Sequence, residues 1–345
     1  MDTSWNDFSF VVQMPHMAPG ETLSEVELLK MLAAYQWEAI ARALGQRPPD
    51  IANEQKERLY GSVIDVELHL GERHSMDLLG EDVNVHVRNR VRFFAKKFVE
   101  GLFVIDDKEI PESDLSGFET REDLRRSGGS WACMTNAFIA RTGGNVRLKV
   151  FKPAGADAVR VAELRETPLG IVEQGRVQAS GELPGVEAGD DAIPLREARP
   201  GGIAYSIVPE SDLNGAGLVY FARYEAMMNY GERIFLSRHL ERPLSAELIS
   251  YLSTEHRRAY FFANASPTDT VEVHVEAALL PPDSFTTPAG VSRYRVPAKL
   301  LFRIDLYRTS DNMLMASSLV RKSLNVPGHA KAVLAEVERL LRRLG

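Results

Sequence analysis

A histidine, two prolines and a glycine stand directly before the longest apolar stretch near the amino terminus. These residues are Pro15, His16, Pro19 and Gly20, within PHMAPGETLSEVELLKML. The bend is either an ordinary turn or the rim of an active site at a helix N-terminus. At such a terminus the first backbone N–H groups lack partners within the helix and the helix dipole is positive, so an anionic oxygen is stabilised. His16 would donate a hydrogen bond or accept a proton at an active-site rim, and would be a solvated residue in a simple turn.

Tyr60 and Asn136 are the next candidates for chemistry. The free pKa of a tyrosine is near 10, so Tyr60 would need a nearby base or hydrogen-bond donors to act as a nucleophile. The alternative is a core tyrosine whose hydroxyl bonds to the backbone. Strand alternation places Tyr60 on one face with Ile64, Val66 and Leu68, toward the long helix. Asn136 stands in an otherwise apolar strand, where it would hold a substrate oxygen or, as the residues favour, make one hydrogen bond within the sheet.

The second half of the chain contains a carboxylate pattern of its own. The pattern consists of Asp212, Asn214 and Glu232, and a carboxylate there could act as the base that activates water. The alternative, which we favour, is that Asp212 caps the turn into a helix while Asn214 and Gly215 form a turn. The single cysteine, Cys133, has no histidine or helix terminus beside it in the sequence, which predicts a buried structural thiol.

These candidates need rigid elements to position them. Apolar residues at three- and four-residue spacing predict a helix from about residue 23 to 44, with Thr22 and Glu25 at capping-box spacing and Gly45 at its end. Alternating patterns then predict strands at 57–70, 82–97, 100–105, 130–141 and 144–151. One long helix followed by consecutive strands is typical of an α+β fold, because parallel strands would need a helix between each pair.

The same order of elements occurs twice. A strand at 203–208, a turn and long helix within 212–240 and strands at 257–264, 269–280, 294–309 and 312–324 repeat the first pattern at an offset of roughly 195 residues. We therefore predict a duplicated domain, with a first domain at 1–152, a Gly/Pro-rich linker at 153–200 and a second domain at 201–345 that ends in a helix.

The composition excludes several classes of protein. The chain has 345 residues, 44% hydrophobic and 26% charged, with a net charge of -7 and one cysteine. This is globular composition in which no stretch is long and apolar enough to span a membrane. The acidic balance argues against a nucleic-acid protein. The amino terminus lacks the pattern of a signal peptide, and the solitary cysteine fits a reducing cytoplasm. The eight histidines are scattered, and phosphate-binding glycine loops are absent.

Two parts of the sequence resemble known families. The segments MPHMAPGETLSEVELLKMLAAYQWEAIARALG, ERLYGSVIDVE and SWACMTNAFIAR resemble the LnmK-like family of bifunctional acyltransferase/decarboxylases of leinamycin-type polyketide biosynthesis. DLNGAGLVYFARYEAMMNYGE resembles a stretch of hot-dog acyl-CoA thioesterases. The first resemblance spans approximately residues 8–325. It implies an α+β double hot-dog fold, in which two antiparallel sheets each wrap a long central helix.

The family resemblance implies a cytoplasmic enzyme that decarboxylates malonyl- or methylmalonyl-CoA and loads the acyl group onto an acyl carrier protein. It assigns Tyr60 as the acyl-accepting nucleophile. Because the enolate formed by decarboxylation needs donors at its oxygen, we predict that the bend at 15–20 holds that oxygen.

We predict Tyr60 and His16 as catalytic residues and Gly20, Glu25 and Asn136 as substrate-binding residues. Beyond the CoA thioester and the phosphopantetheine arm of the carrier, no cofactor or metal is expected, nor is a nucleic-acid or membrane partner, and a homodimer is left open. The alternatives are a hot-dog thioesterase or dehydratase that uses Asp212 or His16, and a non-catalytic subunit that docks on the carrier.

Overall fold

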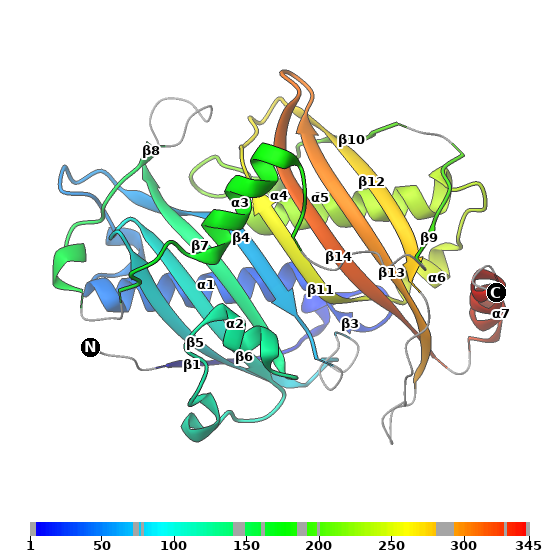
Figure 1. Ribbon diagram of the computed structural model, residues 1–345, viewed down its shortest axis with the longest axis horizontal. Coiled ribbons are helices and arrows are strands. Elements are labelled where there is room, and N and C mark those ends of the chain that lie inside the picture. The colour runs from blue at the N-terminus through cyan, green and yellow to red at the C-terminus, as the bar shows by residue number, and fades with distance from the viewer. Residues whose placement is uncertain are drawn as a thin grey trace.

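The computed structural model describes residues 5–71, 76, 79–140, 149–159, 163–184, 192–198, 201–280, 293–327 and 330–342. A large twisted sheet forms the middle layer, with α1 (Glu25–Leu44) and α5 (Phe221–Ile234) against one face (Figure 1). The opposite face, called the outer face below, carries α2 (Arg121–Arg126) and α3 (Leu169–Ser180). No helix among the described residues is long and apolar enough to cross a membrane.

The first half of the sheet surrounds α1. Its strands run antiparallel in the order β1-β5-β6-β7-β4. Alternation puts Val85 and Val87 of β5 against Leu28 and Leu32 of α1, in one buried core. The strands span β1 Asn6–Val11, β4 Leu59–His69, β5 Asn84–Phe94, β6 Phe98–Asp106 and β7 Ser130–Ala140, and β8 (Lys149–Val150) pairs with β7.

The second half repeats this arrangement around α5. The strand order is β11-β14-β13-β12-β10, and α5 continues as a π-helical turn at Phe235–His239. Its strands span β10 Ile203–Ser206, β11 Leu252–Phe261, β12 Thr270–Leu280, β13 Arg293–Arg308 and β14 Met313–Pro327. Short helices α4 (Pro209–Asp212) and α6 (Ala246–Ser250), strand β9 (Ile193–Pro194) and the terminal helix α7 (Lys331–Leu341) complete this half.

The two halves join edge to edge through β4 and β11. His69 pairs with His256, and Asp65 pairs with Tyr260, so the sheets merge into one sheet of twelve strands. Counted from each outer edge of the sheet towards the junction, the strands of the two halves follow one another in equivalent order. This is expected of two copies related by a twofold axis. The predicted α+β double hot-dog fold is confirmed, and its two sheets form one continuous sheet.

The segment predicted as a linker contains regular structure. Helix α3 (Leu169–Ser180) packs against β4, β7 and β11, so it covers the junction of the two halves. A single helical turn at Ala156–Ala158 also lies in this segment. Residues 160–162, 185–191 and 199–200 of the predicted linker lie outside the described residues. The domain boundaries themselves stay a prediction.

A β-bulge in β4 changes which face Tyr60 occupies. The pairing with β7 shifts between Val63 and Asp65, so the alternation of side chains reverses there. Tyr60 packs on the outer face with Ala137 and Ile139, whereas Val66 faces α1. The prediction that Tyr60 shares the helix-facing side with Val66 and Leu68 is therefore wrong, because an extra residue in a strand shifts every later side chain to the other face.

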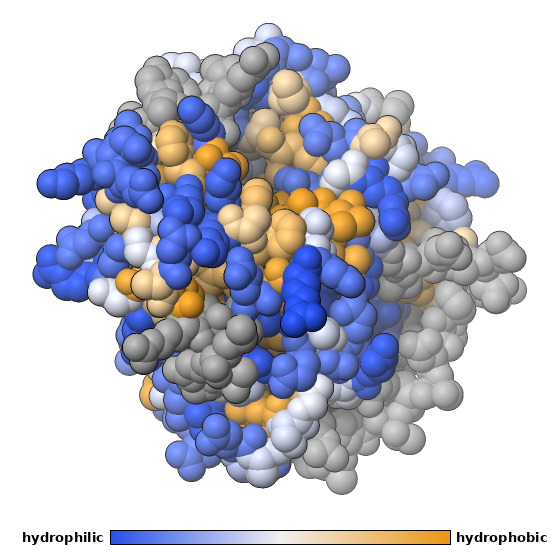
Figure 2. All heavy atoms as spheres, turned by 60° about the vertical axis from the view of Figure 1, so that its left-hand side comes forward, coloured by the Kyte–Doolittle hydropathy of each residue, from blue (hydrophilic) through white to orange (hydrophobic). Residues whose placement is uncertain are grey.

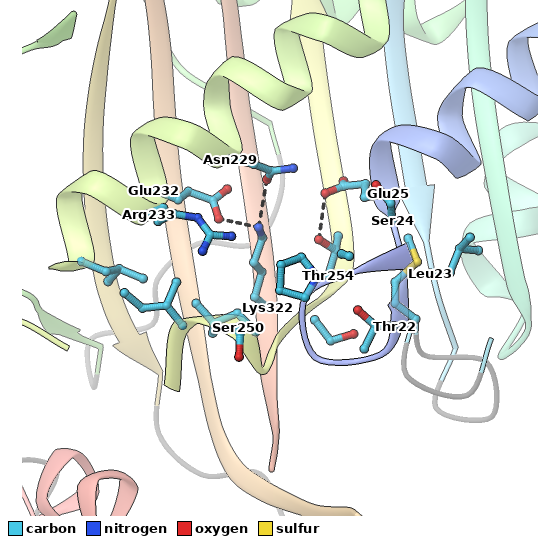
Figure 3. A pocket seen from close by; sticks show the side chains of 17 residues that line it. Thr22, Leu23, Ser24, Glu25, Asn229, Glu232, Arg233, Ser250, Thr254 and Lys322 are labelled. Carbon is cyan, nitrogen blue, oxygen red and sulfur yellow. Dashed lines mark hydrogen bonds and ion pairs between the residues drawn. The ribbon is translucent and has the colours of Figure 1, made fainter. Parts of the chain in front are cut away.

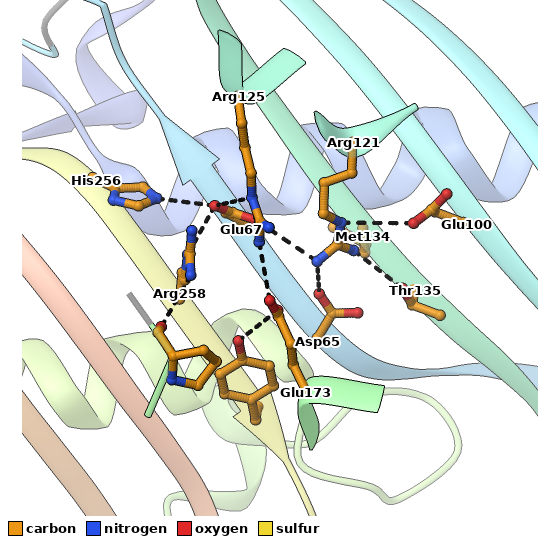
Figure 4. Close-up of polar contacts among 12 residues, drawn as sticks. Asp65, Glu67, Glu100, Arg121, Arg125, Met134, Thr135, Glu173, His256 and Arg258 are labelled. Atoms are coloured by element: carbon orange, nitrogen blue, oxygen red, sulfur yellow. Dashed lines mark hydrogen bonds and ion pairs between the residues drawn. The ribbon is translucent and has the colours of Figure 1, made fainter. Parts of the chain in front are cut away.

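Buried ion pairs hold α2 and α3 to the outer face (Figure 4). Glu67 of β4 contacts Arg125 of α2 at 2.6 Å and Arg258 of β11 at 2.8 Å. Asp65 contacts Arg121 of α2 at 2.6 Å. Further contacts involve Glu100, Arg92, Glu173 and Tyr260. The network joins both halves of the sheet to the two helices.

Apolar residues also reach the surface of the first half. Viewed from that end, they form several patches between charged side chains (Figure 2). Tyr60 belongs to a half-buried group on the outer face with Ile64, Phe98 and Val150.

Candidate functional site

The bend before α1 is a small hairpin. Strands β2 (Met17–Ala18) and β3 (Thr22–Leu23) pair across it, and the Ser24 N–H donates to the His16 carbonyl at 2.8 Å. The His16 ring accepts a hydrogen bond from the Gln13 N–H through Nδ1 at 3.1 Å. The ring therefore closes the turn at Met14–His16, as the turn alternative anticipated.

Gly20 lets the hairpin dock on the second half of the molecule. Its φ is +90°, and a Cβ atom there would clash with the Ser250 carbonyl oxygen at the end of α6. Only glycine combines this backbone conformation with such a close approach. The contact explains why a glycine occupies this position. The close approach is to the backbone at Ser250 and not to an open space.

Helix α1 begins at Glu25 with Ser24 as its N-cap residue. Thr22 pairs with Ala18 in the hairpin, so the capping box predicted from the spacing of Thr22 and Glu25 does not form. The Ser24 side chain does not cap the helix either. The Glu25 carboxylate is consequently not bonded to its own helix end, and it reaches across to the second half.

A charged pocket of about 120 Å³ lies where the N-terminus of α1 meets the second half (Figure 3). Ser24 and Glu25 come from the start of α1, Thr254 from β11 and Lys322 from β14, with Asn229, Glu232 and Arg233 from α5. Pro19 and the apolar residues Leu23, Met76, Leu236, Ile249 and Leu252 also line it, together with the hydroxyl residues Thr22, Ser250 and Ser253. The pocket thus combines groups for proton transfer and anion binding with apolar side chains.

Arg257 of β11 organises the carboxylates beside this pocket. It is fully buried and holds Glu25 through two contacts, Nε–Oε1 at 2.5 Å and Nη2–Oε2 at 3.1 Å. It also contacts Glu225 at 2.9 Å and Glu232 at 3.4 Å. Lys322 pairs with Glu232 and donates to Asn229 at 3.0 Å. Thr254 donates its hydroxyl hydrogen to Glu25 at 2.9 Å.

Three buried carboxylates therefore share two buried cations, and the pKa values of Glu25 and Glu225 shift in opposite directions. Burial opposes ionisation of Glu25, but Arg257 and Lys322 outweigh it and lower the pKa of Glu25 below its usual range. Burial raises the pKa of Glu225 to about 7, against the attraction of Arg257. Glu25 is then ionised at neutral pH, whereas Glu225 exchanges its proton there.

A second pocket of about 220 Å³ lies beside the middle of α1 and is called the neutral pocket below, because its lining contains no acidic residue and only one basic residue, Arg58. Trp37 of α1, Val63 of β4 and Asn136 of β7 line it together with Tyr220 and Phe221 at the start of α5. The Gln36 side chain donates to Asn136 Oδ1 at 2.7 Å. This lining is aromatic and amide-rich.

The two pockets occupy equivalent places in the two halves. Ser24 and Tyr220 are the N-cap residues of α1 and α5, and both β4 and β11 carry a bulge, which follows Val63 in β4 and Thr254 in β11. Aligning these features matches Glu25 with Phe221, Glu232 with Gln36, Arg233 with Trp37, Thr254 with Val63 and Lys322 with Asn136. Each charged residue of the charged pocket therefore has a neutral residue at the equivalent place in the other half, although Arg58 adds a charge to the lining of the neutral pocket.

The predicted site residues are divided between these two places. Glu25 lines the charged pocket, while Asn136 and Tyr60 line the neutral one. Twelve residues of helix separate Glu25 from Trp37, which is about 18 Å. His16 lines neither pocket. The geometry therefore gives no support for a pair in which His16 is the base that Tyr60 would need.

The candidate residues of the second half also lie in different places. Glu232 lines the charged pocket. Asp212 is buried, accepts a hydrogen bond from the Val208 N–H at 2.8 Å and pairs with Arg223 at 2.9 Å, so it holds the turn before α5. Asn214 accepts from the N–H groups of Ala216 and Leu218, as a turn residue does. Cys133 is buried, as predicted.

Sequence patterns alone did not reveal Arg257, Lys322 or Glu225. Each stands in an element predicted from its apolar residues, and only the pairing of elements far apart in sequence brings their charges together. Charged residues on a core-facing position are a usable signal, because such residues are rarely buried unless paired. In the part of the chain that the structure describes, no group of three or more His, Cys, Asp or Glu side chains is placed to hold a metal ion.

Comparisons with known proteins agree with the fold. No protein-family model and no curated protein sequence matches this chain. The solved structure of a putative oleoyl thioesterase from Lactobacillus plantarum is similar over 93% of this chain and 96% of its own, with a TM-score of 0.55 and 12% identity. An acyl-ACP thioesterase from Bacteroides thetaiotaomicron is similar over 92% and 97%, with a TM-score of 0.51 and 12% identity. The chain shares the double hot-dog fold of these proteins.

Proposed function

We propose that this chain hydrolyses acyl thioesters of coenzyme A or of an acyl carrier protein in the charged pocket, with Glu25 as the general base. The observation that supports this proposal is the position of Glu25, an ionised carboxylate at the start of α1 that lines a pocket together with Lys322. The double hot-dog fold, shared with thioesterases, agrees with a thioester substrate.

The reaction follows from the groups around the pocket. Water attacks the thioester carbonyl carbon, and its proton passes to Glu25. The carbonyl oxygen becomes an oxyanion, to which we assign the first-turn N–H groups of α1 and the Lys322 ammonium as donors. When the oxyanion collapses, the carbon–sulfur bond breaks and the thiolate takes up the proton. Water is the only co-substrate, so the proposal needs no metal or added cofactor.

Arg257 and Thr254 have a positioning role in this proposal. They fix both oxygens of Glu25 and keep it ionised. The same contacts make Glu25 a weaker base, because a lower pKa reduces its affinity for the proton. These contacts therefore lower the basicity of Glu25 but hold its carboxylate in a fixed orientation at the reacting centre.

The neutral pocket supports a second candidate, transfer with decarboxylation of a malonyl-type thioester to a carrier protein. A carboxylate that leaves as carbon dioxide loses its charge, which the aromatic and amide residues of this pocket favour and the positive charge of Arg58 opposes. Tyr60 would be the acyl acceptor, although its ring packs on the outer face beside Ala216 and Leu218. The resemblance to the LnmK-like family remains the main argument for this candidate.

One experiment distinguishes the two candidates. The purified chain is mixed with acetyl-, hexanoyl-, palmitoyl-, malonyl- or methylmalonyl-CoA, with and without a holo carrier protein. Thiol release is followed by absorbance, and acids and carrier are identified by mass spectrometry. The hydrolase proposal predicts free acid and free thiol, and a loss of about 100-fold or more in kcat/KM for Glu25→Gln. Glu27→Gln is the matched control, since Glu27 lies in the same helical turn but pairs with Lys30 at 2.7 Å.

The opposite outcome is equally definite. A carrier loaded with acetyl or propionyl, with carbon dioxide released and with both lost in Tyr60→Phe, would replace hydrolysis by the second candidate. Full hydrolysis by Glu25→Gln would remove Glu25 from the mechanism.

A further inference from the structure

Glu225 of α5 is a buried carboxylate that the proposed reaction does not use. Its side chain is completely buried and does not line the charged pocket. It contacts Arg257 Nη1 at 2.9 Å, while Glu25 contacts Nε and Nη2 of the same guanidinium. Neither Glu225 oxygen has a partner in hydrogen-bond geometry among the described residues. Glu225 and Glu25 thus share one cation from two sides.

The charges around Glu225 explain why this sharing matters. Arg257 of β11 and Lys322 of β14 are the cations that act on it, and Glu25 of α1 and Glu232 of α5 are the anions. If all three carboxylates were ionised, they would exceed the two cations by one charge inside a buried cluster. Such an excess is costly in a medium of low dielectric constant, so one carboxyl is expected to hold a proton. Glu225 is the member without hydrogen-bond donors and away from the pocket, which makes it that site.

We propose that Glu225 is a positioning residue that sets the basicity of Glu25 through Arg257, by competing for the guanidinium when it is ionised and releasing it to Glu25 when it is protonated. The proposal rests on the proposed function only where activity is the readout. With Glu225 protonated, Arg257 acts mainly on Glu25 and makes it a weak base. With Glu225 ionised, the attraction is divided and the repulsion between the carboxylates makes Glu25 a stronger base.

We expect this change in the basicity of Glu25 near neutral pH. Burial raises the pKa of Glu225 to about 7, so its ionisation accompanies a rise in pH through that value. The turnover rate should increase over the same interval. A change of one unit in the pKa of a general base alters the rate about threefold when the Brønsted coefficient is about 0.5.

The test compares Glu225→Gln with the wild type in pH–rate profiles between pH 5.5 and 8.5. Glutamine imitates the protonated side chain at every pH. We expect the variant to turn over at the wild-type rate below about pH 6, and to lack the roughly threefold rise near pH 7. A role in stability alone would lower the rate by one factor across the whole range. That outcome would overturn the proposal.

A second measurement does not depend on activity. Carbon-13 NMR of glutamate carboxyl groups should show one resonance that titrates near pH 7 in the wild type and is missing in Glu225→Gln. The Glu25 resonance, assigned with Glu25→Gln, should shift at the same midpoint only when Glu225 is present. If Glu25 ignores this titration, the inference fails even where hydrolysis is found. If the coupled titration is observed without hydrolysis, the proposed function fails and the coupling stands.

Discussion

The Glu25 carboxylate and the Arg257 guanidinium are 232 residues apart in the sequence, yet they form a buried ion pair with an Nε–Oε1 distance of 2.5 Å. Glu25 opens the central helix of the first half, and Arg257 lies in the strand by which the second half joins the sheet. The pair links the helix of one copy to the strand of the other. The charged pocket therefore exists only where the two halves are in contact.

Replacing Arg257 should destabilise the whole molecule. Arg257→Leu leaves three buried carboxylates opposed only by Lys322, and breaking a buried pair in this way costs about 3–5 kcal/mol. Urea unfolding measures the loss. The control is Arg303→Leu, because Arg303 pairs with Asp305 at 3.2 Å with its side chain 39% exposed, and such a pair contributes about 1 kcal/mol or less. Equal losses in the two variants would contradict the assignment of Arg257 as the central cation.

The Gly20 contact gives a matched comparison of two glycines. Gly20→Ala meets both a positive φ and the Ser250 carbonyl, so we expect it to lose about 2–4 kcal/mol. Gly45→Ala, at the C-cap of α1, also has a positive φ but meets nothing within 4 Å, and should lose only about 1 kcal/mol. Thermal unfolding of both variants isolates the clash with Ser250. A loss no larger at Gly20 than at Gly45 would show that the hairpin tolerates displacement from the second half.

Thr254 tests the equivalence of the two pockets. Thr254→Val installs the residue found at the matching place in the neutral pocket and removes the hydrogen bond of 2.9 Å to Glu25. If this bond contributes about 1.4 kcal/mol to orientation, kcat/KM for thioester hydrolysis should fall about tenfold. Thr254→Ser keeps the hydroxyl and should retain most of the activity. An equal fall in both variants would point to packing rather than to the hydrogen bond.

Much of the fold could be predicted from the sequence, because its elements have strong periodicity. Helix α1 and strands β5 and β12 begin and end within two or three residues of their predicted bounds. The repeat of strand, bend, helix and strands correctly indicated duplication. Helix α3 was missed because its apolar face is weak, and because its contacts include the buried carboxylate Asp65, beneath Gly170, rather than an apolar groove.

The site was harder to predict than the fold, for two physical reasons. The bulge between Val63 and Asp65 places Tyr60 on the outer face. The sequence of β4 alternates without a visible interruption, so its pattern does not indicate that a bulge is present. Glu25 was predicted as a substrate-binding residue and lines the charged pocket, but its partners Arg257 and Lys322 belong to the other half. Their approach depends on the junction of β4 with β11, which local patterns do not encode.

Acid should weaken the junction of the two halves through His69. The His69 ring stacks on Trp131 with centroids 5.4 Å apart and lies edge-on to His256 at 5.6 Å. Burial, reinforced by the neighbouring charge of His256, lowers the pKa of His69 to about 4 from 6.5. Because the unfolded chain binds a proton to this ring at a higher pH than the folded chain, stability falls as pH decreases from about 6.5 to 4. The loss from this residue is about 3 kcal/mol at most.

The decisive comparison is His69→Phe against the wild type in urea unfolding at pH 7 and pH 4.5. Phenylalanine keeps the stack on Trp131 and has no proton to bind, so the variant should lose less stability on acidification than the wild type. His274→Phe is the control, since the His274 side chain is 47% exposed. Glu67 also contributes acid sensitivity in both proteins, because its folded pKa is lowered by His256 and Arg125 despite burial, and its contribution falls only as pH drops below about 4.5. A wild type and His69→Phe variant that lose equal stability between pH 7 and 4.5 would show that the His69 ring takes up its proton without disturbing the junction.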